Sequence, residues 1–290
     1  MLSDALRSEL IFLLRSGSAT RLDDCLIIRT PDNPTYWWGN TLFFDRAPIP
    51  GDFPRWRHLF EAQIRAAQPA SLHTTFGWTG RETGYIEPFI EAGFEFFETL
   101  EMIAERSSPI EAPHPYPGAR IAALGAADWI ALKDLLVETR DPAHSCESYS
   151  VFVQRRIDAW RVLSDLGQGA WFGAWLSADG VWRLVSALGV FVEASPGVDG
   201  RRIGRFQNVV THPSARRQGL AGTLVATAAH YAFAALAADT LLILADEHDV
   251  ARRIYAATGF RTRGKQCGLE LAGYSALATV MFPSSDTPAR

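Results

Sequence analysis

A glycine-rich turn at residues 216–222, between a predicted strand and a predicted helix, could bind an anion. The first backbone N–H groups of a helix are unpaired and carry partial positive charge. Gly219, Ala221 and Gly222 let a phosphate approach the backbone closely, and Arg216 and Arg217 add full positive charges. The turn therefore predicts a pyrophosphate site, against the alternative of an ordinary connection whose glycines only permit tight packing.

Two motifs, in this order, resemble those of the GNAT superfamily of N-acetyltransferases. Arg216-x-x-Gly219-x-Ala221 is similar to the acetyl-CoA-binding motif of that family, Gln/Arg-x-x-Gly-x-Gly/Ala. A short apolar strand follows at residues 241–245, and residues 251–260 then resemble the family's Ala-x-x-Leu-Tyr-x-x-x-Gly-Phe motif. The resemblance covers roughly the C-terminal 170 residues, an ordinary size for one domain. It implies an acetyl-CoA-dependent N-acetyltransferase that acts on a primary amine of a small-molecule or amino-acid-like acceptor, by direct attack on the thioester.

The attack of an amine on a thioester needs an amine without its extra proton, a donor to the carbonyl oxygen and an acid for the departing thiolate. The resemblance implies that the backbone of a splayed strand near Val209 and Val210 supplies the donor and also pairs with the pantetheine arm. Tyr255, in the second motif, is the candidate acid, since a phenol with a pKa of about 10 can protonate a thiolate with a pKa of about 8.5. The alternative for Tyr255 is a core tyrosine. The cofactor-binding residues that the resemblance implies are Val209, Val210, Thr211, Arg216, Arg217, Gln218, Gly219, Leu220, Ala221 and Gly222.

The sequence leaves the general base open between Glu193, His248 and a water. Glu193 ends a predicted strand, where an exposed carboxylate is the commoner case. His248 stands where the family often carries an asparagine that contacts the cofactor, which puts that contact in doubt here. An unperturbed histidine has a pKa of about 6.5 and could serve as a base.

The composition is that of a soluble globular protein. Its 290 residues are 48% hydrophobic and carry a net charge of -4, whereas a general nucleic-acid binder is usually basic. The apolar stretch at residues 10–14 is far too short to span a membrane. Cys25, Cys146 and Cys267 lie far apart, without the spacing of a metal site or a disulfide framework, so we expect no metal and a reducing cytoplasm. The sequence leaves open whether the protein forms a homodimer.

Residues 1–106 are interpreted as a degenerate, noncatalytic GNAT-like domain. Gly93-Phe94 corresponds to Gly259-Phe260, which places Phe89 where the second motif has Tyr255. The alternative is that Gly-Phe merely ends a short helix. The elements expected here are helices over 1–16 and 53–67 and strands over 25–29, 36–44, 72–78 and 95–104.

A proline-rich linker at 107–118 is expected to join this half to a catalytic GNAT domain at 119–282, followed by a frayed tail at 283–290. The expected fold class is α/β (α+β), with a mixed, mostly antiparallel sheet flanked by helices in a GNAT-like fold, present in two copies. The elements expected in the second half are strands over 120–124, 169–176, 181–193 and 206–211, helices over 127–139 and 149–166, and the two motif helices. Arg201, Arg202 and Arg205 could bind an acidic substrate, but we expect them to solvate a hairpin.

Two GNAT-like halves could share one long sheet or exchange strands, with the acceptor pocket between them. A different class of function also fits such a pair of halves, namely a noncatalytic acyl-CoA-binding or self-association module. Steady consumption of acetyl-CoA with an amine would argue against that module.

Overall fold

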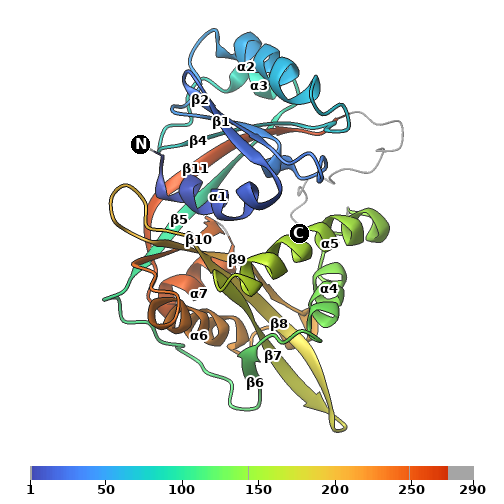
Figure 1. The fold of residues 1–290 in the computed structure, drawn as a ribbon, viewed down its shortest axis with the longest axis vertical. Helices are drawn as coiled ribbons and strands as arrows, with labels where there is room; N and C mark the ends of the chain where they lie inside the picture. Colours follow the sequence, from blue (N-terminus) through green and yellow to red (C-terminus); the bar gives the residue numbers. More distant parts are fainter. Residues whose placement is uncertain (1, 143, 248, 274–290) are drawn as a thin grey trace, which may run out of the picture.

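The computed structural model describes residues 2–142, 144–247 and 249–273, which fold around one twisted sheet with helices on both faces (Figure 1). The described residues form an 11-stranded sheet in the order β1-β2-β3-β4-β11-β5-β10-β9-β8-β7-β6. Only the β3–β4 and β9–β10 pairs are parallel. The predicted mixed, mostly antiparallel sheet flanked by helices is therefore confirmed, and the two halves share one sheet.

The first half follows most of the predicted elements. Its elements are α1 (Asp4–Ser16), β1 (Ser18–Leu22), β2 (Cys25–Arg29), a 3-10 turn (Trp37–Gly39), β3 (Thr41–Phe44), α2 (Asp52–Phe60), a π turn (Glu61–Arg65), β4 (Thr74–Thr79), α3 (Glu87–Glu91) and β5 (Glu95–Glu105). The strand expected over 36–44 is wrong before Thr41, because Asn40 holds the preceding loop in a turn. The Asn40 side-chain amide donates to the carbonyls of Asn33 and Tyr36, at 3.0 and 2.9 Å. β1 was not predicted.

The second half has the predicted order of elements. They are β6 (Arg120–Ala123), α4 (Trp129–Glu138), α5 (Cys146–Asp165), β7 (Gly169–Ala178), β8 (Val181–Val192), β9 (Ile203–Thr211), a 3-10 turn (Pro213–Ala215), α6 (Leu220–Ala234), β10 (Thr240–Asp246), α7 (Val250–Thr258) and β11 (Arg261–Leu271). α4 and α5 cover one face of this half, and α6 and α7 cover the other.

The last strands of the two halves are exchanged. β5 pairs antiparallel with β10, with Ala104 opposite Leu241. β11 lies on the other side of β5 and also pairs with β4. As a result, Leu100 and Met102 of β5 belong to the buried core under α6 and α7, whereas Leu269 of β11 belongs to the core of the first half. Neither half completes its own sheet.

Helix α1 also connects the halves, since it lies between them on one face of the sheet (Figure 1). Leu6 and Leu13 pack with Ile28 of β2. The residue before Leu6, Ala5, packs against Leu242 of β10 in the second half. The first half therefore supplies a helix as well as a strand to the second.

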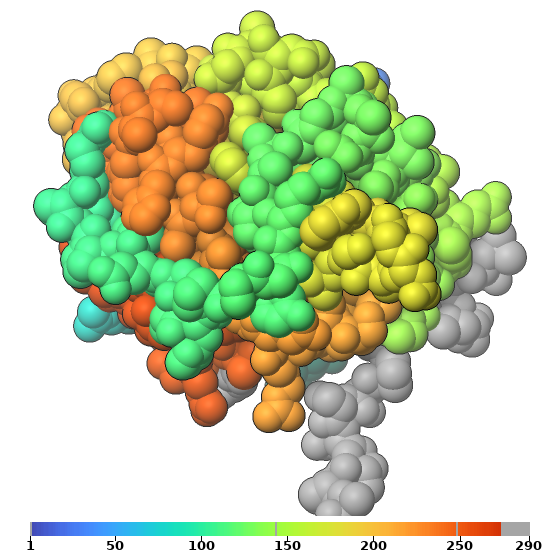
Figure 2. All heavy atoms as spheres, turned by 90° about the horizontal axis from the view of Figure 1, so that it is seen from below, coloured from blue at the N-terminus to red at the C-terminus, as the bar shows by residue number. Residues whose placement is uncertain are grey.

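The linker at residues 107–118 runs from β5 past α7 and α6 toward β6 at the far edge of the sheet (Figure 1). Figure 2 shows its green residues lying against the orange residues of α6. The Glu111 backbone N–H donates to the Thr258 carbonyl at 3.2 Å, and His230 Nε2 lies 3.0 Å from the Ile110 carbonyl. The linker is thus packed along α6 and α7. The domain boundaries on either side of it stay predictions.

Candidate functional site

The two parallel strands of the second half separate along their length. β9 and β10 are paired only at Ile203–Thr240, Gly204–Leu241 and Arg205–Leu242. β9 then continues to Thr211, while β10 stays paired with β5 as far as Asp246. Within the described residues, the edge of β9 beyond Arg205 therefore has no strand partner on the β10 side, so its backbone is open to an added extended segment.

A β-bulge turns β9 at the point where the strands part. Val210 lies opposite Ala187, but Gln207 lies opposite Gly189, so β9 has one extra residue in this interval. Asn208 carries the left-handed backbone conformation, with φ +44°, and is exposed. Val209 and Val210 follow it and are half-buried. Bulges of this kind re-aim backbone groups and end strand pairing. The two valines thus border the opening, and their role as backbone donors stays a prediction.

The predicted anion turn leads from β9 into α6. Arg216 and Arg217 are exposed, and neither forms an ion pair in the part of the chain that the structure describes. The first turn of α6 has no acidic residue, and its N-cap, Gly219, makes no side-chain cap hydrogen bond. The turn therefore offers uncapped helix N–H groups next to two unpaired cations, which suits an anion.

Gly219 and Gly222 also meet the linker, which is the packing alternative for these glycines. Gly219 has φ +76°, and a Cβ built there would lie 1.8 Å from the carbonyl oxygen of His114. A Cβ at Gly222 would contact Pro113 and α7. Leu220 is buried, whereas Gln218 and Ala221 are half-buried. Close approach of the linker thus explains Gly219 without a phosphate, whereas a Cβ at Gly222 would be in ordinary van der Waals contact at 3.7 Å, and Ala221 is the more informative position for a test.

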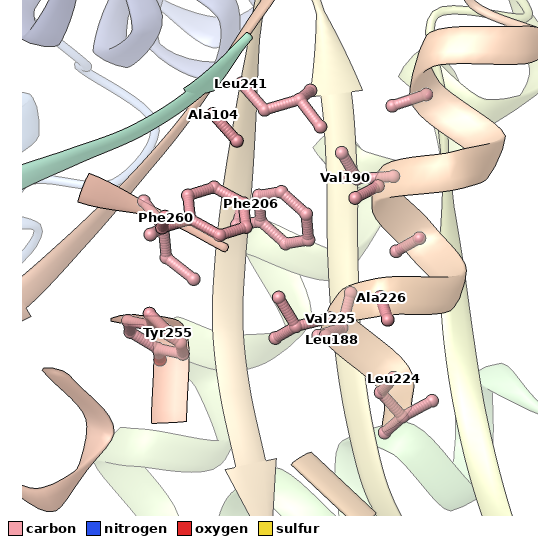
Figure 3. Close-up of a cluster of buried hydrophobic side chains, with 14 of the residues drawn as sticks. Ala104, Leu188, Val190, Phe206, Leu224, Val225, Ala226, Leu241, Tyr255 and Phe260 are labelled. Carbon is pink, nitrogen blue, oxygen red and sulfur yellow. The ribbon is translucent and has the colours of Figure 1, made fainter. Parts of the chain in front are cut away.

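Tyr255 lies on α7, in the core between α7 and β9. The Asp249 side chain caps this helix by accepting from the Ala251 N–H, and Gly259, with φ +115°, ends it. Tyr255 is 5% exposed and belongs to the same cluster as Phe206 and Phe260 (Figure 3). Burial, with a smaller effect of Asp249, raises the pKa of the Tyr255 phenol above its ordinary value. The hydroxyl is therefore protonated at neutral pH and available as a donor.

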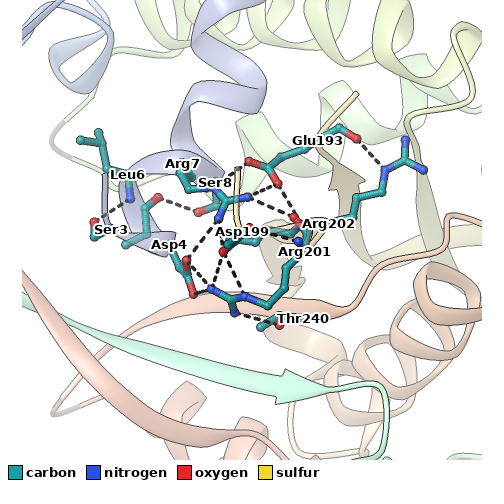
Figure 4. A network of polar contacts seen from close by, with 12 residues as sticks. Ser3, Asp4, Leu6, Arg7, Ser8, Glu193, Asp199, Arg201, Arg202 and Thr240 are labelled. Carbon is teal, nitrogen blue, oxygen red and sulfur yellow. Dashed lines mark hydrogen bonds and ion pairs between the residues drawn. The ribbon is translucent and has the colours of Figure 1, made fainter. Parts of the chain in front are cut away.

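Glu193 is engaged in a polar network and is not a free strand-end carboxylate. Arg7 of α1 donates to both of its oxygens, at 3.0 and 2.7 Å, and the Ile203 N–H donates to it at 3.0 Å (Figure 4). Ile203 is at the end of β9 where the strands are still paired. These contacts give Glu193 a structural role away from the opening. The other side-chain candidate for the base, His248, lies outside the described residues.

The arginines expected on a solvated hairpin instead hold α1. Arg205 is 6% exposed and donates to Ser8 Oγ at 2.9 Å and to Glu9 at 2.6 Å. Arg201 donates to Asp4 at 3.1 Å. The expectation of solvation is wrong for Arg205, because α1 from the first half covers this face of the sheet.

Sequence reasoning missed Glu101, a buried carboxyl on β5. It lies opposite Leu244 of β10 and is 4% exposed. Its Oε1 has no hydrogen-bond partner in the described chain. Burial raises its pKa to about 7, with a smaller contribution from the Asp4 charge and against the smaller effects of Arg263 and Arg205. The sequence holds no signal for this, because Glu101 belongs to the half interpreted as noncatalytic and reaches β10 only through the strand exchange.

The described residues contain neither a candidate metal site nor a candidate membrane-spanning helix. They contain no group of three or more histidine, cysteine or acidic side chains that could hold a metal ion. None of their helices is long and apolar enough to cross a membrane.

Comparison with known proteins finds a family match within the second half of the chain. Residues 129–260 match the acetyltransferase (GNAT) family. No curated protein matches the chain. Among solved structures, the fold is similar to a functionally unknown conserved protein from Staphylococcus epidermidis, with a TM-score of 0.70 and 14% identity over 89% of this chain and 95% of that one. It is also similar to a GCN5-related N-acetyltransferase from Kribbella flavida, with a TM-score of 0.62 and 17% identity over 97% and 99%.

A third similar structure is a tandem GNAT protein from the clavulanic acid biosynthesis pathway, with a TM-score of 0.52 and 14% identity over 81% of this chain and 76% of that one. At such identities these likenesses concern the fold alone.

Proposed function

We propose that this chain, a tandem GNAT protein whose residues 129–260 match the acetyltransferase family, transfers the acetyl group of acetyl-CoA to a primary amine of a small-molecule or amino-acid-like acceptor. The observation that carries the proposal is the separation of β9 from β10 at the Asn208 bulge, next to the N-terminus of α6. An extended thioester arm would pair with the open edge of β9. Its pyrophosphate would lie at the uncapped turn beside Arg216 and Arg217.

In the proposed reaction, one side chain has a direct role, and backbone groups supply the other contacts. The neutral amine attacks the thioester carbon, and a C–N bond forms as the C–S bond breaks. Backbone N–H groups near Val209 and Val210 would stabilise the negative charge on the carbonyl oxygen. Tyr255 would give its proton to the departing thiolate, and the extra proton of the amine would pass to a base or a water. Burial keeps the phenol protonated at neutral pH, so Tyr255 has a proton to donate when the thiolate departs.

The other features of the chain agree with this proposal. The three cysteines are unpaired thiols, as expected for a reducing cytoplasm. The reaction written above needs no metal ion.

The test compares Tyr255→Phe with Tyr231→Phe. Tyr231 lies on α6 and packs against the same core, so its substitution controls for the loss of a hydroxyl near that core. Thiol release from acetyl-CoA would be followed with a panel of primary amines, and acetyl-CoA affinity by calorimetry. We expect Tyr255→Phe to lower turnover by about a hundredfold, as for loss of a general acid, while affinity changes by less than about threefold.

Two results would redirect the proposal. Unchanged turnover in Tyr255→Phe would remove this residue from the acid role. Tight binding of acetyl-CoA without turnover on any amine would favour the noncatalytic acyl-CoA-binding module instead.

A further inference from the structure

An open pocket of about 340 Å³ lies between the two halves of the chain. The first half contributes the end of α1 and the loop at residues 32–36, and the second half contributes the middle of α5. The apolar part of the wall includes Phe12, Tyr36 and Trp160. The pocket is therefore large enough for a small organic molecule, and of these three rings only that of Tyr36 is partly exposed.

The pocket carries an excess of unpaired positive charge. Arg15, Arg155 and Arg156 line it together with Asp32 and Asp158, which gives three positive charges against two negative ones. Within the described ranges, none of the three arginines forms an ion pair with a carboxylate. Asp158, in contrast, already accepts a hydrogen bond from Gln154 at 2.9 Å. An anionic group in the pocket would therefore find free guanidinium donors.

Arg156 is held in a fixed orientation. Its guanidinium carbon lies 4.8 Å from the centroid of the Tyr36 ring and 5.0 Å from that of Trp160. Its Nη2 donates to Gln207 Oε1 at 3.0 Å. Burial raises the pKa of the Tyr36 phenol, so Tyr36 is a neutral donor beside the guanidinium. A preoriented planar guanidinium with remaining N–H groups is well suited to a carboxylate.

The same contact joins the pocket to the opening of the sheet. Gln207, the partner of Arg156, directly precedes Asn208 at the bulge of β9. The pocket and the open edge of β9 are therefore linked through two consecutive residues. The amine of a molecule anchored at Arg156 would have to extend toward β9 to reach the proposed thioester.

We infer that this pocket between the halves binds the anionic end of the acceptor, so that the substrate is an amine that also carries a carboxylate and a flat apolar part, as in an aromatic amino acid. This inference rests on the proposed function for the position of the amine, but the binding of the anion can be measured without it. It also gives the first half of the chain a role in substrate selection.

The test uses phenylalanine and phenethylamine, which differ by the carboxylate alone. Binding of each would be measured by calorimetry, and acetylation of each by thiol release, in the full chain. The variants are Arg155→Gln and Arg156→Gln, with Arg161→Gln as the control, since Arg161 is exposed on the same helix and lies outside the pocket. We expect phenylalanine to be preferred by about tenfold or more, and Arg156→Gln to remove most of that preference, because a charge-assisted hydrogen bond is lost.

The expected pattern also includes a smaller loss in Arg155→Gln, wild-type behaviour in Arg161→Gln and unchanged acetyl-CoA affinity in all three. Equal binding of the two amines by the wild type would overturn the inference, as would a preference that survives both pocket substitutions. If phenylalanine binds through Arg156 but no amine is acetylated, the pocket stands and the proposed function fails. If amines are acetylated without regard to the carboxylate, the function stands and the pocket inference fails.

Discussion

Leu269, in the last described strand, lies directly opposite Phe76 of β4, and both side chains are fully buried in the core of the first half. The chain therefore returns to its beginning to complete that core. In the other direction, β5 supplies the neighbour that β10 needs. The exchange makes the two halves depend on each other, although their motifs and linker suggest separate domains.

The strand exchange predicts the behaviour of separated halves. A fragment of residues 107–290 lacks β5, which leaves the β10 edge and the apolar residues Leu241 and Ile243 without their partners. We expect this fragment to aggregate when expressed alone, since an exposed apolar strand edge pairs with other chains. Co-expression with residues 1–106 should restore a soluble complex that elutes as one species in size-exclusion chromatography.

The contrary outcome has a clear structural meaning. A soluble, monomeric fragment 107–290 that binds acetyl-CoA would show that β11 can take the place of β5 beside β10. The mutual dependence of the halves would then be wrong. Retained acetylation of phenylalanine by that fragment would also contradict a substrate pocket built from both halves.

Because of Glu101, we expect the free energy of unfolding to fall as the pH rises. Its pKa in the folded chain, about 7, is above its ordinary value of 4.5, so folding favours the protonated form. The contribution of Glu101 to the free energy of unfolding is fully present below its pKa in the unfolded chain, about 4.5. It is lost as the pH rises through its pKa in the folded chain, about 7. Between about pH 5 and about pH 8, the free energy of unfolding should fall by about 2 kcal/mol from this group. Denaturant titrations at several pH values measure the slope.

Glu101→Gln keeps the shape of the side chain without a titratable proton and should flatten this pH dependence. Asp4, Arg205 and Arg263 are the charged side chains that act electrostatically on this carboxyl. Glu91→Gln, at the exposed end of α3, is the control and should keep the wild-type slope. Parallel stability curves for Glu101→Gln and the wild type would exclude Glu101 as the source.

Substitution of Gly219 by alanine should lower the free energy of unfolding more than the same substitution at a glycine that has a similar backbone conformation but no close neighbour. Gly219 and Gly200 have φ values of +76° and +74°, but only Gly219 has the His114 carbonyl at its Cβ position. Gly200→Ala should cost about 1 kcal/mol of unfolding free energy, and Gly219→Ala about 2 to 4 kcal/mol. Equal costs would mean that the linker does not pack against α6 as described.

The reactivity of the three cysteine thiols measures how accessible the core of the first half is to solvent. Cys25 and Cys267 are fully buried in the same cluster, and burial raises the pKa of each to about 11. Cys146 is exposed. A disulfide reagent at neutral pH should therefore label Cys146 quickly and the other two only after denaturation, because the reaction needs an accessible thiolate. Rapid labelling of a Cys146→Ser variant would show that β11 leaves the core of the first half easily.

The helices and strands that carry the two motifs could be predicted from sequence because their signals are local. The β-branched run of β9 and the helical spacing that follows Leu220 are set by neighbours within a few residues. The backbone splay near Val209 came from the family resemblance, and the pairing of β9 with β10 bears it out.

Long-range relationships could not be predicted in this way. β11 has the same apolar alternation whether it lies beside β10 or beside β4, so the pattern does not choose between them. Glu101 and Tyr36 become relevant only when β5 and the first-half loop are placed against the second half. The burial of Arg205 likewise depends on α1, which is about two hundred residues away in the chain and has the general pattern of an amphipathic helix.

The central claim is that the turn before α6 binds acetyl-CoA, and calorimetric titration with acetyl-CoA tests it most directly. The comparison uses the wild type, Ala221→Glu and Ala221→Gln. Ala221 is half-buried at the start of α6, where a carboxylate favours the helix, so loss of binding would not reflect unfolding. We expect saturable binding by the wild type, weakened at least about tenfold more by glutamate than by glutamine, because the carboxylate repels the pyrophosphate. No binding by the wild type, or equal binding by the two variants, would contradict the claim.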